Sequence, residues 1–408
     1  MIFFKKFNEV WKISKIKLYL CGIIKLEEKE SMDNFIVSAR KYRPSTFRSV
    51  VGQETITSTL KNAIKNNQIA QAFLFCGPRG VGKTTCARIF AKALNCLNLT
   101  DDFEPCNECD SCKAFNNSAS FNVFELDAAS NNSVDDIREL VDDVRIPPIN
   151  ARFKVYIIDE VHMLSAQAFN AFLKTLEEPP ANVKFILATT EKHKIIPTIL
   201  SRCQVYDFKR ILDNDIVKHL KYVAEQENIE VEEDALRVMA AKADGALRDA
   251  LSIFDQQVSF LGKNISYKET IKNLNVLDVD NYFEAVDKVF SENIGDALLL
   301  LDQIISNGFD PQNFISGLAS HIRNLLIAKN PSTIQLLQVS DSVKQRLFTQ
   351  SQKADPMLLT RALELANQCD FNYKSSNNKR LSVELCLMQI NANYLYRVKN
   401  VRQSQERR

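Results

Sequence analysis

The stretch AFLFCGPRGVGKTTCARIFAKAL (72–94) decides the fold. An apolar run is followed by a segment that matches the pattern GxxxxGK[ST], and a helical pattern begins at Lys83. In such a strand, glycine-rich turn and helix, backbone N–H groups curl around phosphate oxygens at the helix N-terminus. Lys83 supplies positive charge to the β- and γ-phosphates, and Thr84 offers a hydroxyl to Mg²⁺. The predicted nucleotide-binding residues are Gly77, Pro78, Arg79, Gly80, Val81, Gly82, Lys83, Thr84 and Thr85.

Two carboxylates end a later apolar run, KVYIIDE (154–160). Asp159 is suited to hold Mg²⁺ through its water shell, together with Thr84. Glu160 is suited to orient and polarise a water molecule for attack on the γ-phosphate. The pair therefore predicts ATP hydrolysis with Lys83, Asp159 and Glu160 as catalytic residues, because ATP-binding chains without turnover tend to lose one of these groups.

Short apolar runs alternate with helical patterns from residue 72 onward. This alternation is typical of a parallel sheet covered on both faces, whose doubly buried strands stay apolar along most of their length. Helices are predicted over 83–94 and 166–177. The predicted strands are AFLFCG (72–77), NVFELDAA (122–129), KVYIIDE (154–160), VKFILATT (183–190) and QVYDFK (204–209).

Strand patterns fade after Arg210, and helical patterns follow over 213–260 and again from about Val279. In the second block Gly308 predicts the end of a helix, and Asp310 with Pro311 predicts the N-cap and first residue of the next one. Two buried helix faces are predicted there, one formed by Leu298, Leu301 and Ile305 and the other by Phe314, Leu318, Ile322 and Leu325.

Composition and charge narrow the class of protein. The chain has 408 residues, of which 45% are hydrophobic and 25% charged, as in globular proteins of two or three domains. With 52 basic and 50 acidic residues the net charge is only +2, which argues against a simple DNA-binding protein but not against a machine that grips DNA when assembled. No apolar run reaches the roughly 18 residues of a membrane span.

The N-terminus does not match a signal peptide. Its basic residues precede only a short apolar patch (18–24), and an acidic run follows without a small-residue cleavage site. We therefore expect a cytoplasmic protein with no membrane partner. Residues 1–31 are either an extension or an over-extended gene start, because Met32 directly precedes the segment where strong patterns begin.

Four of the ten cysteines cluster as Cys96-x9-Cys106-x2-Cys109-x2-Cys112. In a reducing compartment such a cluster favours a metal over disulfides, and four thiolates at these spacings suit tetrahedral Zn²⁺. The surrounding sequence predicts a polar loop with no open coordination position, hence a structural site. An iron–sulfur cluster also uses four cysteines, but redox chemistry has no evident role beside a phosphate loop, so zinc is the favoured metal.

The chain resembles the AAA+ clamp-loader ATPases, and the cysteine insert after the phosphate-loop helix narrows this to the gamma/tau family of bacterial DNA polymerase III. The similarity runs from Ser38 to at least Gln256 and more weakly to about residue 400, and SARKYRPSTFRSVVGQE (38–54) resembles the opening stretch that borders the adenine. Besides the cysteine insert, the matching motifs are, in order, GPRGVGKT (77–84), DEVHMLS (159–165), FILATTE (185–191) and SRC (201–203).

The resemblance implies roles that spacing alone does not. Arg202 matches an arginine finger that reaches the ATP of a neighbouring subunit; without the resemblance, a surface arginine at a helix end is the preferred interpretation. Thr190 matches the first sensor, a polar residue on the strand between the phosphate-loop strand and the acidic strand. Arg248, in GALRDAL (245–251), matches the second sensor, which contacts the γ-phosphate from the helical lid of the same subunit.

The implied fold is α/β, an AAA+ P-loop core with a five-stranded parallel sheet, followed by a helical lid and an all-α collar through which subunits oligomerise. The predicted boundaries are 1–31 for the N-terminal extension, 32–210 for the core with the zinc-binding insert at 96–112, 211–275 for the lid, 276–400 for the collar and 401–408 for a basic tail.

The family's complex opens a ring-shaped sliding clamp and places it on primed DNA with hydrolysis of ATP. The resemblance therefore implies an ATPase subunit of a hetero-oligomeric clamp loader, with ATP, Mg²⁺ and Zn²⁺ as cofactors, that is not itself the polymerising subunit. The implied partners are delta- and delta-prime-type subunits, the sliding clamp, primed DNA and the polymerase core. The chain lacks the long tail of tau forms and so resembles the shorter gamma form, which argues against polymerase tethering by this chain.

The sequence argues against other functions that share some of these features. A AAA+ branch-migration helicase or another DNA-remodelling motor would share the phosphate loop, but the cysteine insert and the SRC motif argue against it. A scaffold that binds ATP without turnover is disfavoured by the intact Lys83, Asp159, Glu160 and Arg202.

Overall fold

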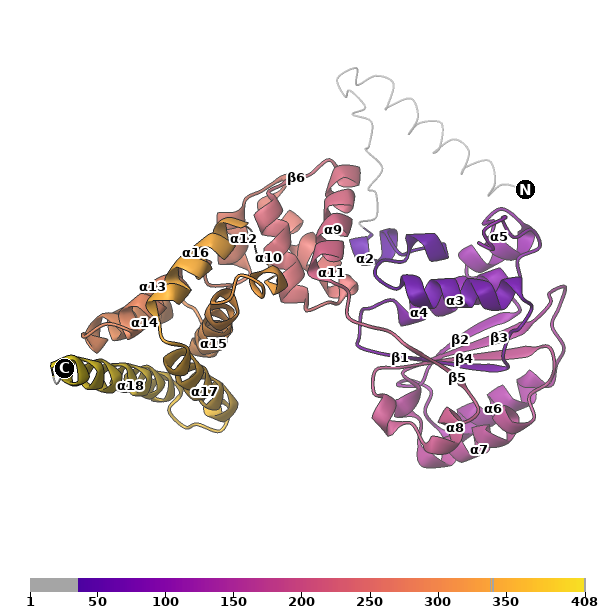
Figure 1. The fold of residues 1–408 in the computed structure, drawn as a ribbon. Coiled ribbons are helices and arrows are strands. Elements are labelled where there is room, and N and C mark those ends of the chain that lie inside the picture. The colour runs from indigo at the N-terminus through magenta and orange to yellow at the C-terminus, as the bar shows by residue number, and fades with distance from the viewer. Residues whose placement is uncertain (1–35, 338, 340, 407–408) are drawn as a thin grey trace, which may run out of the picture.

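A computed structural model describes residues 36–337, 339 and 341–406. The predicted extension at 1–31 and the side chains of the predicted basic tail lie outside the described residues. An α/β core, a small helical domain and a larger helical domain follow one another along the chain (Figure 1). Among the described residues, no helix is both long enough and apolar enough to cross a bilayer.

The core is built on a five-stranded parallel sheet with the order β2-β3-β4-β1-β5. Each strand lies within its predicted range, so the predicted sheet is confirmed: β1 Ala72–Cys76, β2 Val123–Asp127, β3 Lys154–Asp159, β4 Val183–Thr189 and β5 Gln204–Asp207. Because β4 lies between β1 and β3, the carboxyl ends of the phosphate-loop strand and the acidic strand meet at one edge of the sheet, on either side of the end of β4.

Helices cover both faces of the sheet (Figure 1). On β1, Phe73 and Phe75 pack with the core cluster on one face, and Leu74 packs with the cluster on the other, as the alternation of strand side chains requires. The helices of the core are α2 Ser38–Lys41, α3 Glu54–Lys65, α4 Lys83–Leu94, α5 Asp110–Asn116, α6 Val134–Val144, α7 Ala166–Glu177 and α8 Pro197–Leu200, with the short 3-10 helices η1 Phe47–Ser49, η2 Val161–Met163 and η3 Lys192–Lys194.

The small helical domain has a core of its own, to which Leu220, Met239 and Phe254 contribute. A parallel pair of two-residue strands links the segment after its first helix to the segment before its last helix. The sequence did not predict these strands because two residues are too few to carry an apolar alternation. Its elements are α9 Asp213–Glu227, β6 Glu230–Val231, α10 Glu233–Ala243, α11 Leu247–Leu261, β7 Asn264–Ile265 and α12 Tyr267–Asn273.

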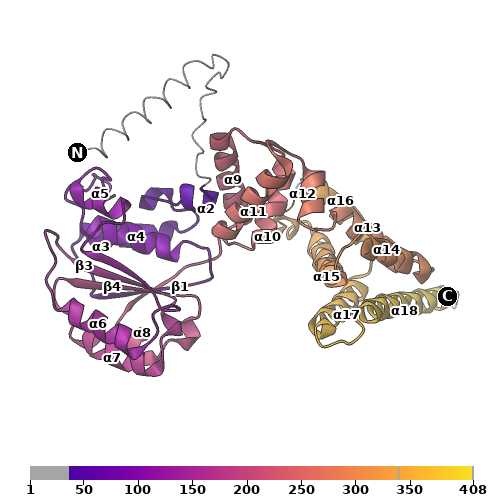
Figure 2. The same ribbon diagram turned by 180° about the vertical axis from the view of Figure 1, so that it is seen from behind.

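The larger helical domain lies beyond the small one, away from the core (Figures 1 and 2). Its helices are α13 Val279–Val289, α14 Ile294–Ser306, α15 Pro311–Ala328, η4 Ile334–Leu336, α16 Asp341–Lys353, α17 Pro356–Tyr373 and α18 Lys379–Glu406. The last helix therefore continues past residue 400, where the sequence analysis placed the start of a tail. These helices share one hydrophobic cluster, which runs from Leu277 to Ile390.

The apolar faces of α14 and α15 were predicted with different success. All four residues predicted on α15 are buried. On α14 only Leu301 of the three predicted residues is buried, and Leu298 and Ile305 are half-buried. The other buried residues of this helix are Ala297, Leu300 and Ile304.

The turn between these helices follows the prediction. Gly308 adopts a φ of +87° after the end of α14, a conformation that favours glycine. Asp310 caps α15 by accepting a hydrogen bond from the backbone N–H of Gln312 at 2.7 Å, and Pro311 is the first residue of the helix.

Candidate functional site

A pocket at the junction of the core and the small helical domain contains most of the predicted nucleotide-binding residues. Residues 79–85 of the phosphate loop line it, with Asp159, Glu160 and Arg248; Gly77, Pro78, Thr190 and Arg202 do not. The opening segment, predicted to border the adenine, contributes Ala39, Tyr42, Arg43, Pro44, Val50 and Val51.

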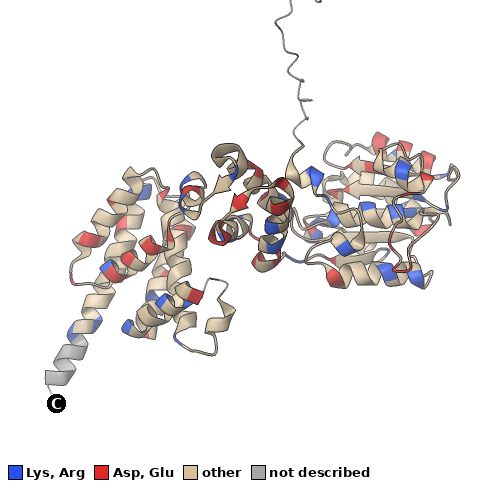
Figure 3. Cartoon of the chain, turned by 90° about the horizontal axis from the view of Figure 1, so that it is seen from above, with Lys and Arg blue, Asp and Glu red and all other residues tan. Residues whose placement is uncertain are grey.

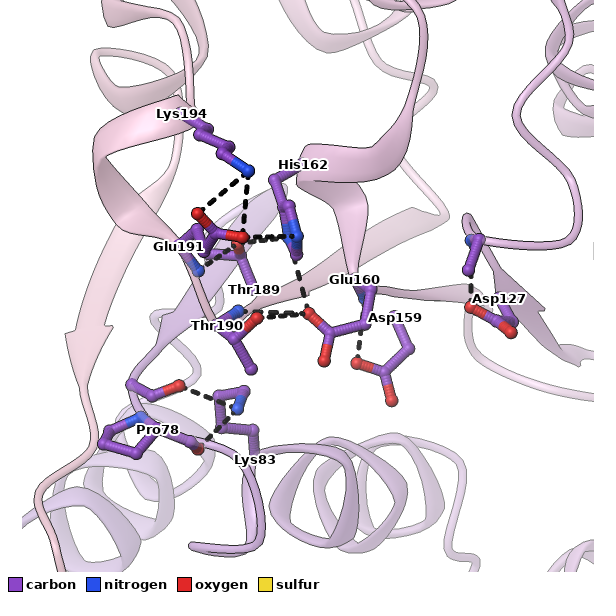
Figure 4. Close-up of polar contacts among 12 residues, drawn as sticks. Pro78, Lys83, Asp127, Asp159, Glu160, His162, Thr189, Thr190, Glu191 and Lys194 are labelled. Carbon is purple, nitrogen blue, oxygen red and sulfur yellow. Dashed lines mark hydrogen bonds and ion pairs between the residues drawn. The ribbon is translucent and has the colours of Figure 1, made fainter. Parts of the chain in front are cut away.

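Lys83 is the first residue of α4 and directly follows the loop that joins β1 to this helix. Its ammonium donates hydrogen bonds to the carbonyl oxygens of Gly77 at 2.8 Å and Pro78 at 2.7 Å, which keep it at the centre of the loop (Figure 4). Burial lowers the pKa of Lys83, while the carboxylates of Glu160 and Asp159 oppose that shift. The loop therefore presents a cation that faces two carboxylates across the pocket.

The two predicted Mg²⁺ ligands are in direct contact. The Thr84 hydroxyl donates to Asp159 Oδ2 at 2.6 Å, although the residues come from α4 and from the end of β3. Asp159 Oδ1 accepts a hydrogen bond from the backbone N–H of Glu160 at 2.9 Å, which fixes the orientation of the carboxylate. A hydroxyl and a carboxylate side by side are oxygen ligands of the kind that Mg²⁺ takes, so the residues fit this ion.

Glu160 is held at the end of β3 by the end of β4. Its backbone has a φ of +47°, in the left-handed region, and its Oε2 accepts hydrogen bonds from the backbone N–H of Thr190 at 3.2 Å and from the Thr190 hydroxyl at 2.8 Å. Figure 4 shows the other carboxylate oxygen turned toward the side of the site where Lys83 lies. The geometry thus gives Thr190 a contact with the predicted water-activating carboxylate.

His162 is a residue of this site that the sequence analysis quoted within DEVHMLS but did not single out. Its nearly buried ring lies between two carboxylates, with Nδ1 3.4 Å from Glu160 Oε2 and Nε2 3.4 Å from Glu191 Oε1. Nδ1 also lies 3.0 Å from the Thr189 hydroxyl (Figure 4). Only its position two residues after the acidic pair, on the turn that follows β3, could have drawn attention to it.

Arg248 lies at the start of α11, and its backbone N–H donates to the carbonyl oxygen of Gly80 at 3.3 Å. Gly80 has a φ of +78°, and a Cβ at this position would lie 3.0 Å from the Cβ of Ala246. The phosphate loop and the small helical domain are therefore in contact through backbone atoms. This contact places the Arg248 side chain on the wall of the pocket.

The structure does not bring Arg202 into the pocket. Its guanidinium donates to the carbonyl oxygen of Thr198 at 2.8 Å and pairs with Glu177 Oε1 at 2.7 Å. Both atoms belong to the same core domain, near α8 and the end of α7. Within this chain Arg202 is a partly exposed surface arginine.

The four predicted zinc ligands come together, with their sulfur atoms all within 4.8 Å of one another. The Sγ atoms of Cys96 and Cys106 are 3.5 Å apart, and those of Cys106 and Cys112 are 3.9 Å apart. Zn–S bonds of about 2.3 Å in a tetrahedron place sulfur atoms about 3.8 Å apart, so the cluster fits zinc. The sequence placed all four in a loop, but Cys112 lies buried within α5.

The thiols of this cluster differ in acidity. Burial acts to raise the pKa of Cys106, but hydrogen bonds from the backbones of Glu108 and Cys109 and from neighbouring thiols outweigh it and lower the pKa to about 6. Burial and a hydrogen bond with Cys109 raise the pKa of Cys112. Because cysteine binds metals as the thiolate, metal binding to this cluster releases protons.

A parallel sheet with a phosphate loop, an acidic pair and a helical lid that contacts the loop defines the AAA+ class of P-loop proteins. Comparisons with known proteins narrow the class, because three family models match consecutive parts of the chain. They are described as "DNA polymerase III, delta subunit" for residues 52–212, "DNA polymerase III clamp loader subunit, ATPase lid domain" for 215–263 and "DNA polymerase III delta subunit, C-terminal domain" for 279–390.

Full-length relatives agree with the family models. The chain is 36% identical to the DNA polymerase III subunit gamma of Buchnera aphidicola subsp. Acyrthosiphon pisum, over 86% of this chain and 91% of that protein. It is 41% identical to the subunit tau of Bacillus subtilis, over 86% of this chain and 62% of that protein. The subunit tau of Escherichia coli is 43% identical over 68% of this chain and 43% of that protein.

The chain therefore belongs to the gamma/tau family of DNA polymerase III clamp-loader subunits. It spans less than two thirds of the length of the Bacillus subtilis and Escherichia coli tau proteins. Among solved structures, the Thermotoga maritima RuvB Holliday junction branch migration motor superposes with a TM-score of 0.45 at 17% identity, over 61% of this chain and 80% of that one. A likeness at this level carries no argument about function.

Proposed function

We propose that this chain is an ATP-hydrolysing subunit of a clamp loader, which couples ATP binding and hydrolysis to the placement of a ring-shaped sliding clamp on primed DNA. The observation that carries the proposal is the assembled site at the junction of core and lid, where Lys83, Thr84, Asp159 and Glu160 lie around one pocket. Membership of the gamma/tau family supports the choice of clamp loading over branch migration.

In this proposal the chain's own residues divide the chemistry of ATP hydrolysis among them. Lys83 and the N-terminus of α4 bind the phosphates, and Thr84 with Asp159 holds Mg²⁺, which when bound neutralises phosphate charge. Glu160, fixed through one oxygen by Thr190, has its second oxygen available to accept a proton from the attacking water. Arg248 contributes positive charge from the lid and links lid position to the nucleotide.

The position of Arg202 and the distribution of charge support the proposed assembly. Arg202 lies outside the pocket of its own chain, which is the placement expected of an arginine finger acting on the ATP of a neighbouring subunit. Figure 3 shows basic and acidic residues interspersed over the described part of the chain, so we expect DNA contacts to be modest per subunit and summed over a complex with delta- and delta-prime-type subunits. We propose that clamp loading by this protein takes place in the cytoplasm.

Steady-state ATP hydrolysis by the purified chain tests the proposal, measured alone and with partner subunits, sliding clamp and primed DNA. We expect strong stimulation by clamp and primed DNA together. Glu160→Gln should bind ATP with near wild-type affinity and hydrolyse it about 100-fold more slowly or worse, because the water loses its base. ATPase activity that ignores the clamp would move the chain to another AAA+ function, and wild-type turnover by Glu160→Gln would refute the catalytic assignment.

A further inference from the structure

The four-cysteine insert (residues 96–112) has one buried carboxylate that contacts the core. Glu104 lies in the loop between two of the metal-binding cysteines, and only 8% of its surface is exposed. A buried carboxylate is costly unless donors surround it. Here it has three: the backbone N–H of Phe47 to Oε2 at 2.7 Å, that of Arg48 to Oε1 at 3.0 Å, and the Lys61 ammonium at 2.6 Å from Oε1.

These contacts fix the segment that leads into the nucleotide pocket. Phe47 and Arg48 are the first residues of η1, so Glu104 satisfies backbone donors that the short helix leaves free. The backbone N–H of Val50 bonds to the carbonyl oxygen of Phe47 at 3.2 Å, and Val50 and Val51 line the pocket. A methyl group of Val50 lies 4.0 Å from the place that a Cβ on Gly82 would occupy.

The cysteines fix Glu104 in turn. The two ends of the loop meet where the backbone N–H of Cys106 donates to Cys96 Sγ at 3.4 Å. Glu104 is held in a tight turn with Thr100: its carbonyl oxygen accepts from the Thr100 N–H at 3.0 Å, and its own N–H donates to the Thr100 hydroxyl oxygen at 3.1 Å. A metal that ties the two ends of a loop together removes the conformational freedom of the residues between them. A metal bound by the four cysteines would therefore hold Glu104 in this orientation.

We propose that Glu104 is a positioning residue through which the four-cysteine insert holds one wall of the nucleotide pocket. Metal binding by the insert then raises the affinity of the pocket for ATP. The proposal deepens the proposed function and rests on the nucleotide site of that function. A role in stability alone would predict a different result, because it would lower the melting temperature without a selective effect on nucleotide affinity.

The test measures the dissociation constant of a fluorescent ATP analogue with Mg²⁺ on the full chain, together with zinc content and thermal unfolding. Glu104→Gln keeps the size of the side chain but puts an N–H₂ group among N–H donors. We expect its dissociation constant to rise about five- to tenfold, with zinc content unchanged and the turnover rate at saturating ATP within about twofold of wild type. Asp102→Asn is the matched control, since Asp102 is an exposed acid of the same loop.

Zinc removal provides the second arm of the test. Stripping the wild-type chain with a chelator should weaken nucleotide binding by a similar factor, and stripping Glu104→Gln should add little, because both changes act through one contact. The inference would be overturned if folded, zinc-loaded Glu104→Gln bound the nucleotide with wild-type affinity. It would also be overturned if the affinity losses caused by the substitution and by zinc removal multiplied. If Glu104→Gln does not fold, Lys61→Met removes one donor only and should raise the dissociation constant about twofold; unchanged affinity there overturns it as well.

The result separates this inference from the proposed function. A wild-type chain that does not bind the analogue would remove both together. A wild-type chain that binds it, beside a Glu104→Gln chain of equal affinity, would remove the inference and leave the nucleotide site in place.

Discussion

The nucleotide pocket lies at the junction of the core and the small helical domain, whereas Arg202 lies on the surface of the core and outside that pocket. In the pocket, Thr84 contacts Asp159, and Thr190 contacts Glu160. Arg202 is instead engaged with Glu177 and Thr198, away from the pocket of its own chain. From this difference we expect two kinds of mutational effect: those that an isolated subunit already shows and those that require an assembly.

The largest effect is expected for Arg202→Ala, and it tests the assembly side of the comparison. We predict a loss of about 1,000-fold in ATP hydrolysis by the complete complex, the range of an arginine finger acting on a neighbour. Nucleotide affinity of the isolated chain should not change, because Arg202 does not line its pocket. Paired measurements of affinity in the isolated chain and turnover in the complex check this, and an equal loss in the isolated chain would contradict a role in trans.

Glu177→Gln is the matched control for that experiment. It removes the charged partner of Arg202 while the guanidinium stays in place. The pair is partly exposed, and such pairs contribute about 0.2–1 kcal/mol, so releasing Arg202 is inexpensive. Turnover in the complex should therefore stay within a few-fold of wild type.

Lys83→Ala tests the pocket side and should act in the isolated chain. Removal of the ammonium deletes charge-assisted hydrogen bonds to the phosphates, and we predict a loss of ATP affinity of at least about 100-fold. Equilibrium binding of a fluorescent ATP analogue to the purified chain checks this without any partner. Retention of wild-type affinity would remove the phosphate loop from the proposed function.

The smallest effect is expected for His162, which lies between the two carboxylates beside the pocket. We predict that His162→Ala lowers the turnover rate about tenfold with little change in KM, because Glu160 loses a neighbour that orients it, and that His162→Asn recovers part of the loss. His193→Ala is the control, since His193 approaches Glu191 from an exposed position. A rise in KM without a change in turnover would contradict this role.

Much of the nucleotide site could be predicted because its parts have local patterns. The phosphate loop and the acidic pair each directly follow an apolar strand, so sequence order alone placed them at the ends of strands. The parallel arrangement then brought Thr84 to Asp159, which are 75 residues apart in the chain. Thr190 ends an apolar run, but strand-end threonines are too common to identify a site residue, and its role came from the family resemblance. Arg248 carries no pattern of its own, and only the resemblance pointed to it.

The rest could not be predicted, for physical reasons that differ from place to place. Four consecutive leucines (298–301) leave the phase of α14 undetermined, so two of the three residues predicted on its buried face, Leu298 and Ile305, are only half-buried. The contacts of His162 and Glu104 are tertiary, and a single histidine or glutamate has no sequence signal that reveals its neighbours. The contact of Glu104 with Phe47 joins residues 57 positions apart.

Gly80 has a consequence for how this molecule can be engineered. It is not one of the two glycines that the phosphate-loop pattern requires, yet its missing side chain lets Ala246 of the lid approach, and its carbonyl oxygen accepts a hydrogen bond from Arg248. One residue therefore serves as a spacer for two domains. A side chain at position 80 would push Ala246 of the lid away from the phosphate loop. It would also strain the loop, because the φ of +78° at this position favours glycine. Ala246 is the better position for changing the lid angle. A larger side chain there would contact Gly80 from the lid side and would leave the backbone conformation of the phosphate loop unchanged.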